Sequence, residues 1–190
     1  TSLNILSRLT NQQWLEVSDL QERYSPQDRL SFVQTLQKNT PAIAAVTQQI
    51  RLVILGKPGT GKTTFLKHLA LQCYQESQPL DYFPIFISLR NFANYCQEYD
   101  DFSLLNYIIH FLKSSEISQE EIQDLFKQEK VLLLLDALDE IPQADNEEIL
   151  QAIQQFTEIY HQNRLVITCR IASQAYRFQG FSYVELANFS

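Results

Sequence analysis

The chain has 190 residues, 45% of them hydrophobic, and a chain of this length and composition can form one globular domain with a packed core. Its formal net charge of −7 argues against a general affinity for nucleic acid, which depends on clustered lysine and arginine. The longest uninterrupted apolar run, residues 131–135, is far too short to span a bilayer. No N-terminal stretch has the pattern of a secretory signal. We therefore expect a cytoplasmic protein with no direct nucleic-acid partner and no membrane partner.

The cysteines and the first residue of the chain bear on disulfide and zinc sites and on the length of the natural protein. Cys73, Cys96 and Cys169 are widely spaced and form no Cys-x-x-Cys pair, so the sequence indicates neither a disulfide framework nor a zinc site. The chain begins at Thr1 and contains no methionine, so we expect it to be a fragment of a longer protein.

Residues 1–48 have the spacing of helices, because leucines recur at intervals that a helix gathers on one face. Ser25–Asp28 is a helix start, with serine at the N-cap and proline in the first turn. Thr40-Pro41 repeats that start signal for a shorter helix. No chemical motif accompanies these helices. Three roles therefore remain open for this segment: an adaptor, a linker or the end of a preceding domain.

From residue 49 onward, short apolar segments rich in β-branched residues alternate with helical patterns. Strands are predicted at 51–55, 83–89, 131–135, 164–169 and 181–186. Helices are predicted between them, at 63–75, at 103–113, after the capping box Ser118–Glu121, and at 146–160. This alternation predicts a three-layer α/β domain over residues 49–190, with a parallel sheet and right-handed crossovers.

A glycine-rich loop lies between the first predicted strand and the first predicted helix of this domain. It matches the phosphate-binding Walker A pattern without a gap through Gly56, Lys57, Pro58, Gly59, Thr60, Gly61, Lys62 and Thr63. The glycines allow successive backbone N–H groups to turn toward a phosphate, and the helix N-terminus adds its positive end. We expect Lys62 to reach the β- and γ-phosphates of ATP or GTP and the Thr63 hydroxyl to coordinate Mg²⁺. Thr60 and Thr64 are candidate further phosphate contacts.

Three acids follow the most apolar predicted strand. Asp136 emerges at the carboxyl end of that strand, which is where open parallel sheets bind their ligands. We expect Asp136 to hold Mg²⁺ directly or through water. Asp139 and Glu140 lie just beyond it, and we assign Glu140 as the general base for an attacking water, with Asp139 as its support.

Arg170 stands at the end of the fourth predicted strand, in Thr168-Cys169-Arg170. If this strand lies between the strand of the glycine-rich loop and the acidic strand, Arg170 comes close to a γ-phosphate. There it would sense that phosphate by charge-assisted hydrogen bonds.

These stretches together resemble a known family, the NACHT family of the STAND class of P-loop NTPases. The resemblance is carried by residues 55–66, by the extended acidic motif 132–140 and by the strand 165–170. Ala137 stands in that motif where glycine is more usual. The resemblance implies a five-stranded parallel sheet in the order 5-1-4-3-2 and ATP as the usual nucleotide. It also implies a switch that is closed with ADP and that opens and self-associates with ATP, acting on effector domains in a signalling, defence or cell-death pathway.

Two other functions stay open from the sequence. One is a true turnover enzyme, either an ATPase of the AAA+ kind or a small-molecule kinase, although the later arginines form no lid cluster. The other is an interaction module whose loop no longer serves a nucleotide, against which the intact Lys62, Thr63 and Asp136 argue. The sequence does not separate ATP from GTP.

Overall fold

The computed structural model describes residues 45–74, 81–115, 117–171 and 178–186. The helices predicted within residues 1–44 lie outside the described residues. Residues 45–48 form one short helical turn, closed by a hydrogen bond from Gln49 N–H to Ala45 O (2.8 Å).

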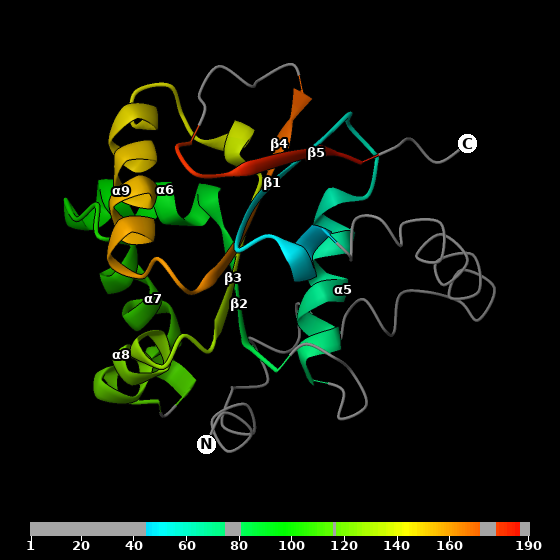
Figure 1. Cartoon of the computed structure of the whole chain (residues 1–190). Helices are drawn as coiled ribbons and strands as arrows, with labels where there is room; N and C mark the ends of the chain where they lie inside the picture. The colour runs from blue at the N-terminus through cyan, green and yellow to red at the C-terminus, as the bar shows by residue number, and fades with distance from the viewer. Residues whose placement is uncertain (1–44, 75–80, 116, 172–177, 187–190) are drawn as a thin grey trace.

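The centre of the fold is a parallel sheet of five strands in the order β2-β3-β4-β1-β5 (Figure 1). The strands are β1 (Arg51–Gly56), β2 (Phe83–Ser88), β3 (Val131–Asp136), β4 (Arg164–Arg170) and β5 (Ser182–Glu185). All four neighbouring pairs are parallel. Read from the other edge, this is the order 5-1-4-3-2, so the predicted fold class and strand order are confirmed.

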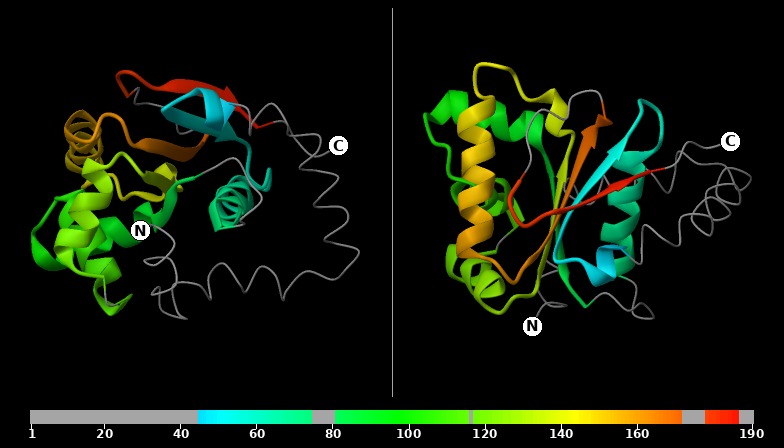
Figure 2. Two further views of the ribbon diagram at one scale, coloured as in Figure 1. Left: turned by 60° about the horizontal axis from the view of Figure 1, so that its bottom comes forward. Right: turned by 45° about the horizontal axis from the view of Figure 1, so that its top comes forward.

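Helices cover both faces of the sheet. Figures 1 and 2 show α5 on one face and α6 to α9 on the other, which gives the three predicted layers. The helices are α5 (Lys62–Tyr74), α6 (Leu89–Tyr99), α7 (Leu104–Leu112), α8 (Gln119–Lys127) and α9 (Asn146–Ile159), with 3₁₀ turns η1 (Lys113–Ser115) and η2 (Leu138–Glu140). The predicted capping box opens α8: Ser118 Oγ accepts from Glu121 N–H (3.1 Å), and Glu121 Oε2 accepts from Ser118 N–H (3.0 Å).

Helix α6 was not predicted, and the predicted strand 83–89 is wrong at its last residue. Strand β2 ends at Ser88 and α6 begins at Leu89 with no loop between them. Ser88 has the extended backbone of an N-cap but makes no capping hydrogen bond with its side chain, so the usual start signal is weak. Leu89, Phe92 and Cys96 have helical spacing and are buried.

Two apolar cores form because successive side chains of a strand point to opposite faces of the sheet. Leu132 and Leu134 of β3 pack in the core that α5 covers, whereas Leu133 and Leu135 pack in the larger core under α6 to α9. All six residues of β3 are buried, as expected of a parallel strand covered on both faces. The sheet therefore fixes the carboxyl ends of β1, β3 and β4 side by side.

Candidate functional site

The glycine-rich loop joins β1 to α5 at the carboxyl edge of the sheet. Gly59 and Gly61 have φ of +78° and +79°, a left-handed conformation that favours glycine. A Cβ on Gly56 would lie 2.5 Å from Thr60 Oγ1, so the turn also requires glycine there. The first helical hydrogen bond of α5 runs from Phe65 N–H to Gly61 O (2.8 Å). The amides of residues 62–64 therefore lie at the open N-terminus of the helix, where an anion binds most readily.

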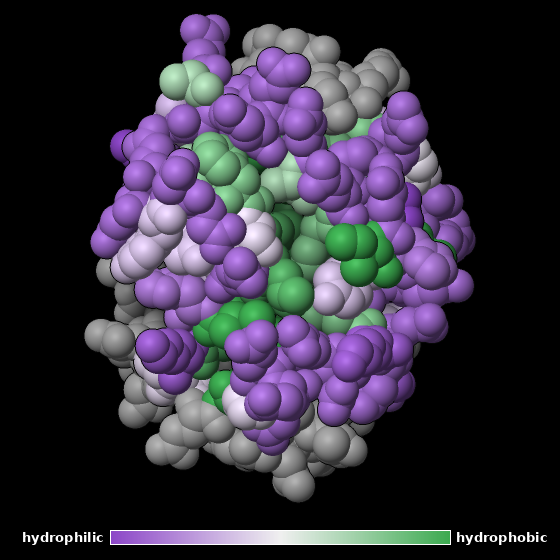
Figure 3. Space-filling model, turned by 90° about the vertical axis from the view of Figure 1, so that its left-hand side faces the viewer, coloured by the Kyte–Doolittle hydropathy of each residue, from purple (hydrophilic) through white to green (hydrophobic). Residues whose placement is uncertain are grey.

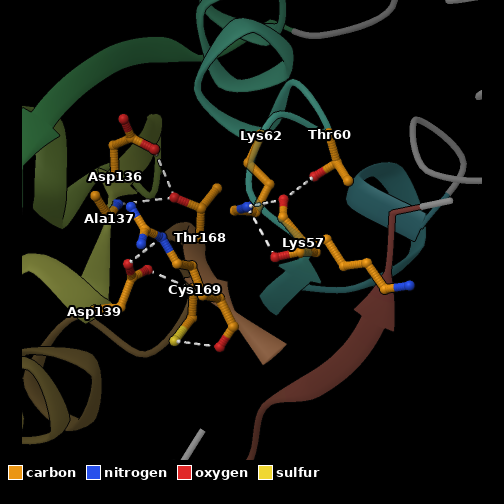
Figure 4. A network of polar contacts seen from close by, with 10 residues as sticks. Lys57, Thr60, Lys62, Asp136, Ala137, Asp139, Thr168 and Cys169 are labelled. Atoms are coloured by element: carbon orange, nitrogen blue, oxygen red, sulfur yellow. Dashed lines mark hydrogen bonds and ion pairs between the residues drawn. The ribbon is translucent and has the colours of Figure 1, made fainter. Parts of the chain in front are cut away.

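Contacts inside the loop set its shape. Thr60 is buried, and its hydroxyl donates to Lys57 O (2.9 Å), so this side chain holds the loop together. Lys62 Nζ donates to Gly56 O and to Lys57 O, both at 2.9 Å (Figure 4). An ammonium group has three donors, so one N–H of Lys62 remains beyond these two bonds. The lysine charge thus lies directly over the loop.

The remaining predicted loop residues lie at the surface of the site. Lys57, Pro58 and Gly59 are exposed in the loop, and Thr63 is exposed in the first turn of α5. Thr64 beside it is half-buried. The Thr63 hydroxyl is therefore accessible at the helix N-terminus, where the sequence predicts a metal ligand.

Asp136 ends β3 and is held by a hydroxyl from the neighbouring strand. Its carboxylate is 7% exposed, and Oδ1 accepts from Thr168 Oγ1 (2.5 Å). Thr168 Oγ1 in turn accepts from Ala137 N–H (2.8 Å). The single hydroxyl proton of Thr168 goes to Asp136, so Asp136 Oδ1 acts as an acceptor. Asp136 Oδ2 makes no hydrogen bond to any described residue. No role for Thr168 was predicted from the sequence; a hydroxyl beside an acid at adjacent strand ends is the signal that points to it.

The strand register places this acid and the glycine-rich loop at the same edge of the sheet. Thr168 pairs with Ile54, and Arg170 pairs with Gly56, where the loop begins. Leu135 pairs with Ile167, which puts Asp136 beside Thr168. In Figure 4, Asp136 and Lys62 lie on either side of Thr168 and Cys169. Lysine and aspartate are therefore at one end of the sheet, as the sequence analysis requires.

The thiol of Cys169 is influenced by the charges of Asp139 and Lys62. Burial and, to a smaller extent, the charge of Asp139 raise its pKa, the charge of Lys62 and a hydrogen bond to the backbone of Arg170 lower it, and the resulting pKa is about 11. Opposite charges at the acidic strand end and the loop both act on this buried sulfur. At neutral pH the thiol is neutral and is not a nucleophile.

Asp139 and Glu140 take different positions in the structure from those assumed in the sequence analysis. Asp139 binds Arg170 rather than Glu140: Oδ2 lies 2.9 Å from Arg170 Nε, and Oδ1 accepts from Arg170 N–H (2.9 Å). Glu140 is exposed, and its carboxylate makes no hydrogen bond or ion pair in the described part of the chain. The cause is the backbone of Ala137, whose φ of 61° and ψ of 60° turn the chain back toward β4.

These residues fit Mg²⁺ only together with a phosphate. Mg²⁺ prefers six oxygen ligands and is usually held by one or two protein groups plus phosphate and water. The Thr63 hydroxyl and Asp136 Oδ2 are oxygen ligands of that kind. No cluster of three or more His, Cys, Asp or Glu side chains that could hold a metal occurs among the described residues. The remaining ligands would therefore come from the nucleotide and from water.

A hollow of the surface lies elsewhere. A groove of about 460 Å³ runs between α7 and α9, and Figure 3 looks onto this side, where apolar side chains gather in a hollow between hydrophilic ones. Among the described residues that line it, Glu148 alone is charged. A phosphate needs donors and positive charge, so this groove does not suit one.

Comparison with known families decides what the chain is. The family model described as NACHT domain matches residues 51–190. The chain belongs to the NACHT family. The domain is therefore a nucleotide-binding NTPase domain. Several solved structures are similar to it at low sequence identity. In the part of the chain that the structure describes, no helix has both the length and the apolar character needed to cross a bilayer.

Three solved structures are examples. AMPPCP-bound DnaA from Aquifex aeolicus is 18% identical, with a TM-score of 0.47, over 86% of this chain and 47% of that one. PCH-2 from C. elegans is 18% identical, with a TM-score of 0.45, over 100% of this chain and 47% of that one. A STAND protein with a tetratricopeptide repeat sensor from Pyrococcus horikoshii is 15% identical, with a TM-score of 0.39, over 77% of this chain and 22% of that one. The chain thus spans less than half of each. No curated protein matches it.

Proposed function

We propose that this NACHT domain binds ATP with Mg²⁺ at the carboxyl edge of its sheet and serves as a slowly hydrolysing signalling switch. The observation that supports this most is the placement of the Lys62 loop and Asp136 at adjacent strand ends, on either side of β4. Positive donors for phosphate and an oxygen ligand for a metal then face the same space. In a longer protein, the switch would act through self-association or effector domains, in the cytoplasm and in a defence or cell-death pathway.

Each residue has a distinct task in this proposal. The backbone N–H groups of the loop, except at Pro58, which has none, and the ammonium of Lys62 bind phosphate oxygens, and Lys62 uses its remaining N–H or exchanges its bonds to Gly56 O and Lys57 O to do so. Thr63 and Asp136 bind the metal, which neutralises phosphate charge when it is present. Thr168 keeps one oxygen of Asp136 fixed so that the other faces the ligand.

Slow hydrolysis follows from the acids. A general base must be held within hydrogen-bond reach of the water that it activates. The exposed carboxylate of Glu140 makes no hydrogen bond or ion pair in the described part of the chain, and Asp139 is already held by Arg170. Glu140 therefore remains our assignment for the base, but this chain alone does not orient it.

A switch also requires that ATP and ADP favour different states. A ligand with equal affinity for two states shifts neither of them. Arg170 is the residue that can make this difference, because it stands beside the first residue of the loop and can donate to the γ-phosphate, which ADP lacks.

Thermal unfolding tests this function. We expect Mg²⁺–ATP at about 100 times its dissociation constant to stabilise the chain by about 2.7 kcal/mol, with ADP also binding and GTP as a comparison. Lys62→Ala should remove this shift. Lys67→Ala is the matched control: it lies on the same helix, with Nζ 5.6 Å from the Phe86 ring, and should keep the full shift.

Phosphate release completes the test. Slow release by a chain that binds ATP supports the switch. Rapid multiple turnover would instead indicate an ATPase of the AAA+ kind. The absence of a shift with every nucleotide would contradict the proposal and indicate a non-binding interaction module.

A further inference from the structure

We propose that Asp139 is a positioning residue that presents Arg170 to the terminal phosphate, and that it is not a support for the general base. This inference rests on the proposed function, because it assigns the means by which the same site distinguishes ATP from ADP. Three observations carry it: a two-point contact, an asymmetry of exposure, and a backbone turn that brings the two residues together.

The contact engages both oxygens of one carboxylate with one residue. Asp139 Oδ1 accepts a hydrogen bond from the backbone N–H of Arg170 (2.9 Å), and Oδ2 forms an ion pair with Arg170 Nε (2.9 Å). The first bond fixes the aspartate to the end of β4, and the second fixes the arginine side chain relative to that strand. Both oxygens are occupied, so neither is directed at Glu140.

The exposure of the two partners is unequal. The Asp139 side chain is 6% exposed, whereas that of Arg170 is 50% exposed. The ion pair is therefore shielded on the carboxylate side, and the outer part of the guanidinium faces open space. Within the described residues, Arg170 Nη1 and Nη2 have no hydrogen-bond partner. These nitrogens remain for a phosphate oxygen.

The backbone at the end of β3 explains why the aspartate reaches this position. Ala137 has a left-handed conformation, its N–H is held by Thr168 Oγ1, and its C=O accepts Glu140 N–H at 3.0 Å in η2. This tight turn sends Asp139 back over β4. The ends of β3 and β4 are thus joined twice, by Thr168 with Asp136 and by Asp139 with Arg170.

The three acids consequently have separate tasks. Asp136 serves the metal, Asp139 holds the arginine, and Glu140 remains for water. Pre-orienting Arg170 reduces the freedom that its long side chain must lose when it contacts a phosphate. The gain applies only to a ligand with a terminal phosphate, so Asp139 increases the preference for ATP over ADP.

The test is the ratio of the ADP and ATP dissociation constants, measured by calorimetry in Mg²⁺ with the full chain. Asp139→Asn keeps the shape but loses the charge and one acceptor. We expect Asp139→Asn and Arg170→Ala each to reduce this ratio about tenfold, as for the loss of one charge-assisted hydrogen bond. The double variant should be no worse than Arg170→Ala alone, because Asp139 acts through Arg170. Asp139→Ser repeats the comparison should Asp139→Asn unfold.

Asp124→Asn is the control, because it removes an exposed ion pair with Lys127, far from this edge of the chain, and should leave the ratio unchanged. An unchanged ratio in Asp139→Asn would overturn the inference, as would effects that add in the double variant. Slower phosphate release with an unchanged ratio would return Asp139 to the role of base support. If the unaltered chain bound no nucleotide, the proposed function itself would fail, which is a distinguishable result.

Discussion

The two ends of the same strands use polar side chains in opposite ways. Strand β4 begins with Arg164 and ends with Arg170. Arg164 Nη1 donates to Val46 O (2.8 Å) and Gln49 O (2.9 Å), and its guanidinium lies 5.3 Å from the centre of the Tyr82 ring. Arg170 is held at Nε and leaves its outer nitrogens open. Arginine therefore stabilises the fold at one end of β4 and is a candidate ligand contact at the other end.

The rest of the amino edge follows the pattern of Arg164. Arg51 Nη2 donates to Thr157 O (2.8 Å), which ties β1 to α9. Asn163 is buried, accepts Val131 N–H (3.1 Å) and donates to Phe126 O (2.8 Å). Here the fold supplies backbone or side-chain partners for most of these polar atoms, although Arg164 Nε is buried without a hydrogen-bond partner among the described residues. At the carboxyl edge, Asp136 and Arg170 each retain polar atoms with no partner among the described residues. These two groups stand at the ends of adjacent strands, and this placement marks the site.

The largest expected effect comes from Asn163 at the amino edge. Asn163→Ala leaves the buried N–H of Val131 without its partner, while Phe126 C=O keeps the hydrogen bond from Glu129 N–H (3.1 Å), so the change should cost about 2 kcal/mol of unfolding free energy. The measurement is urea unfolding. The folded variant should bind Mg²⁺–ATP as the unaltered chain does. Gln162→Ala, at the exposed neighbouring position, should change neither quantity. Weaker ATP binding by folded Asn163→Ala would show that the two edges are not independent.

A smaller change in stability is expected at the carboxyl edge, where the backbone of Ala137 is left-handed. Ala137→Gly should raise the unfolding free energy by about 0.5 kcal/mol, because relief of the left-handed conformation outweighs the added freedom of the unfolded chain. Ala152→Gly, in the regular helix α9, is the matched control and should lower it by about 1 kcal/mol. Equal losses in both variants would mean that the turn at Ala137 carries no strain.

The smallest effect concerns Asp101, which lies away from both edges. Burial opposes its ionisation, but hydrogen bonds from Ser103 N–H, Asn106 and Tyr95 together lower its pKa below the ordinary 3.8. A carboxyl with a lowered folded-state pKa adds stability above the unfolded-state pKa and loses it as the pH falls through the folded-state value. Its contribution should stay below about 1 kcal/mol, because the partners are partly exposed.

Urea unfolding at pH 7 and at pH 3 measures this contribution. Asp101→Asn should be less stable than the unaltered chain at pH 7, and the difference should shrink at pH 3. A difference that is constant between the two pH values would contradict the role of the charge.

Much of the fold could be predicted from the sequence because β3 and the glycine-rich loop have strong local patterns. The apolar run 131–135 predicts a strand that is covered on both faces, and it forms one. Gly59 and Gly61 adopt the positive φ that the glycine-rich pattern requires. Helix α6 was missed because it follows β2 without a loop or a side-chain cap. The apolar residues of α6 do have helical spacing, but they follow directly on the apolar residues of β2, so the two elements could not be separated in the sequence.

The positions of the site residues were predictable and their contacts were not. Asp136 and Arg170 each end a parallel strand, so both were expected at the carboxyl edge of the sheet without knowledge of the exact strand register. The pairing of Asp139 with Arg170 depends on the left-handed turn at Ala137. A left-handed backbone is expected of glycine but not of alanine, so the residue at this position did not predict the turn. The hydroxyl of Thr168 joins residues 32 positions apart, a relation that only the sheet creates.

The most direct test of the account is the effect of Mg²⁺ on ATP affinity in the unaltered chain and in Asp136→Asn. Asparagine keeps an oxygen to accept from Thr168 but removes the charge that would face the metal. We expect that replacing EDTA with excess Mg²⁺ tightens ATP binding to the unaltered chain and has little effect on Asp136→Asn. Equal dependence on Mg²⁺ in both proteins would contradict a metal held between Asp136 and the glycine-rich loop.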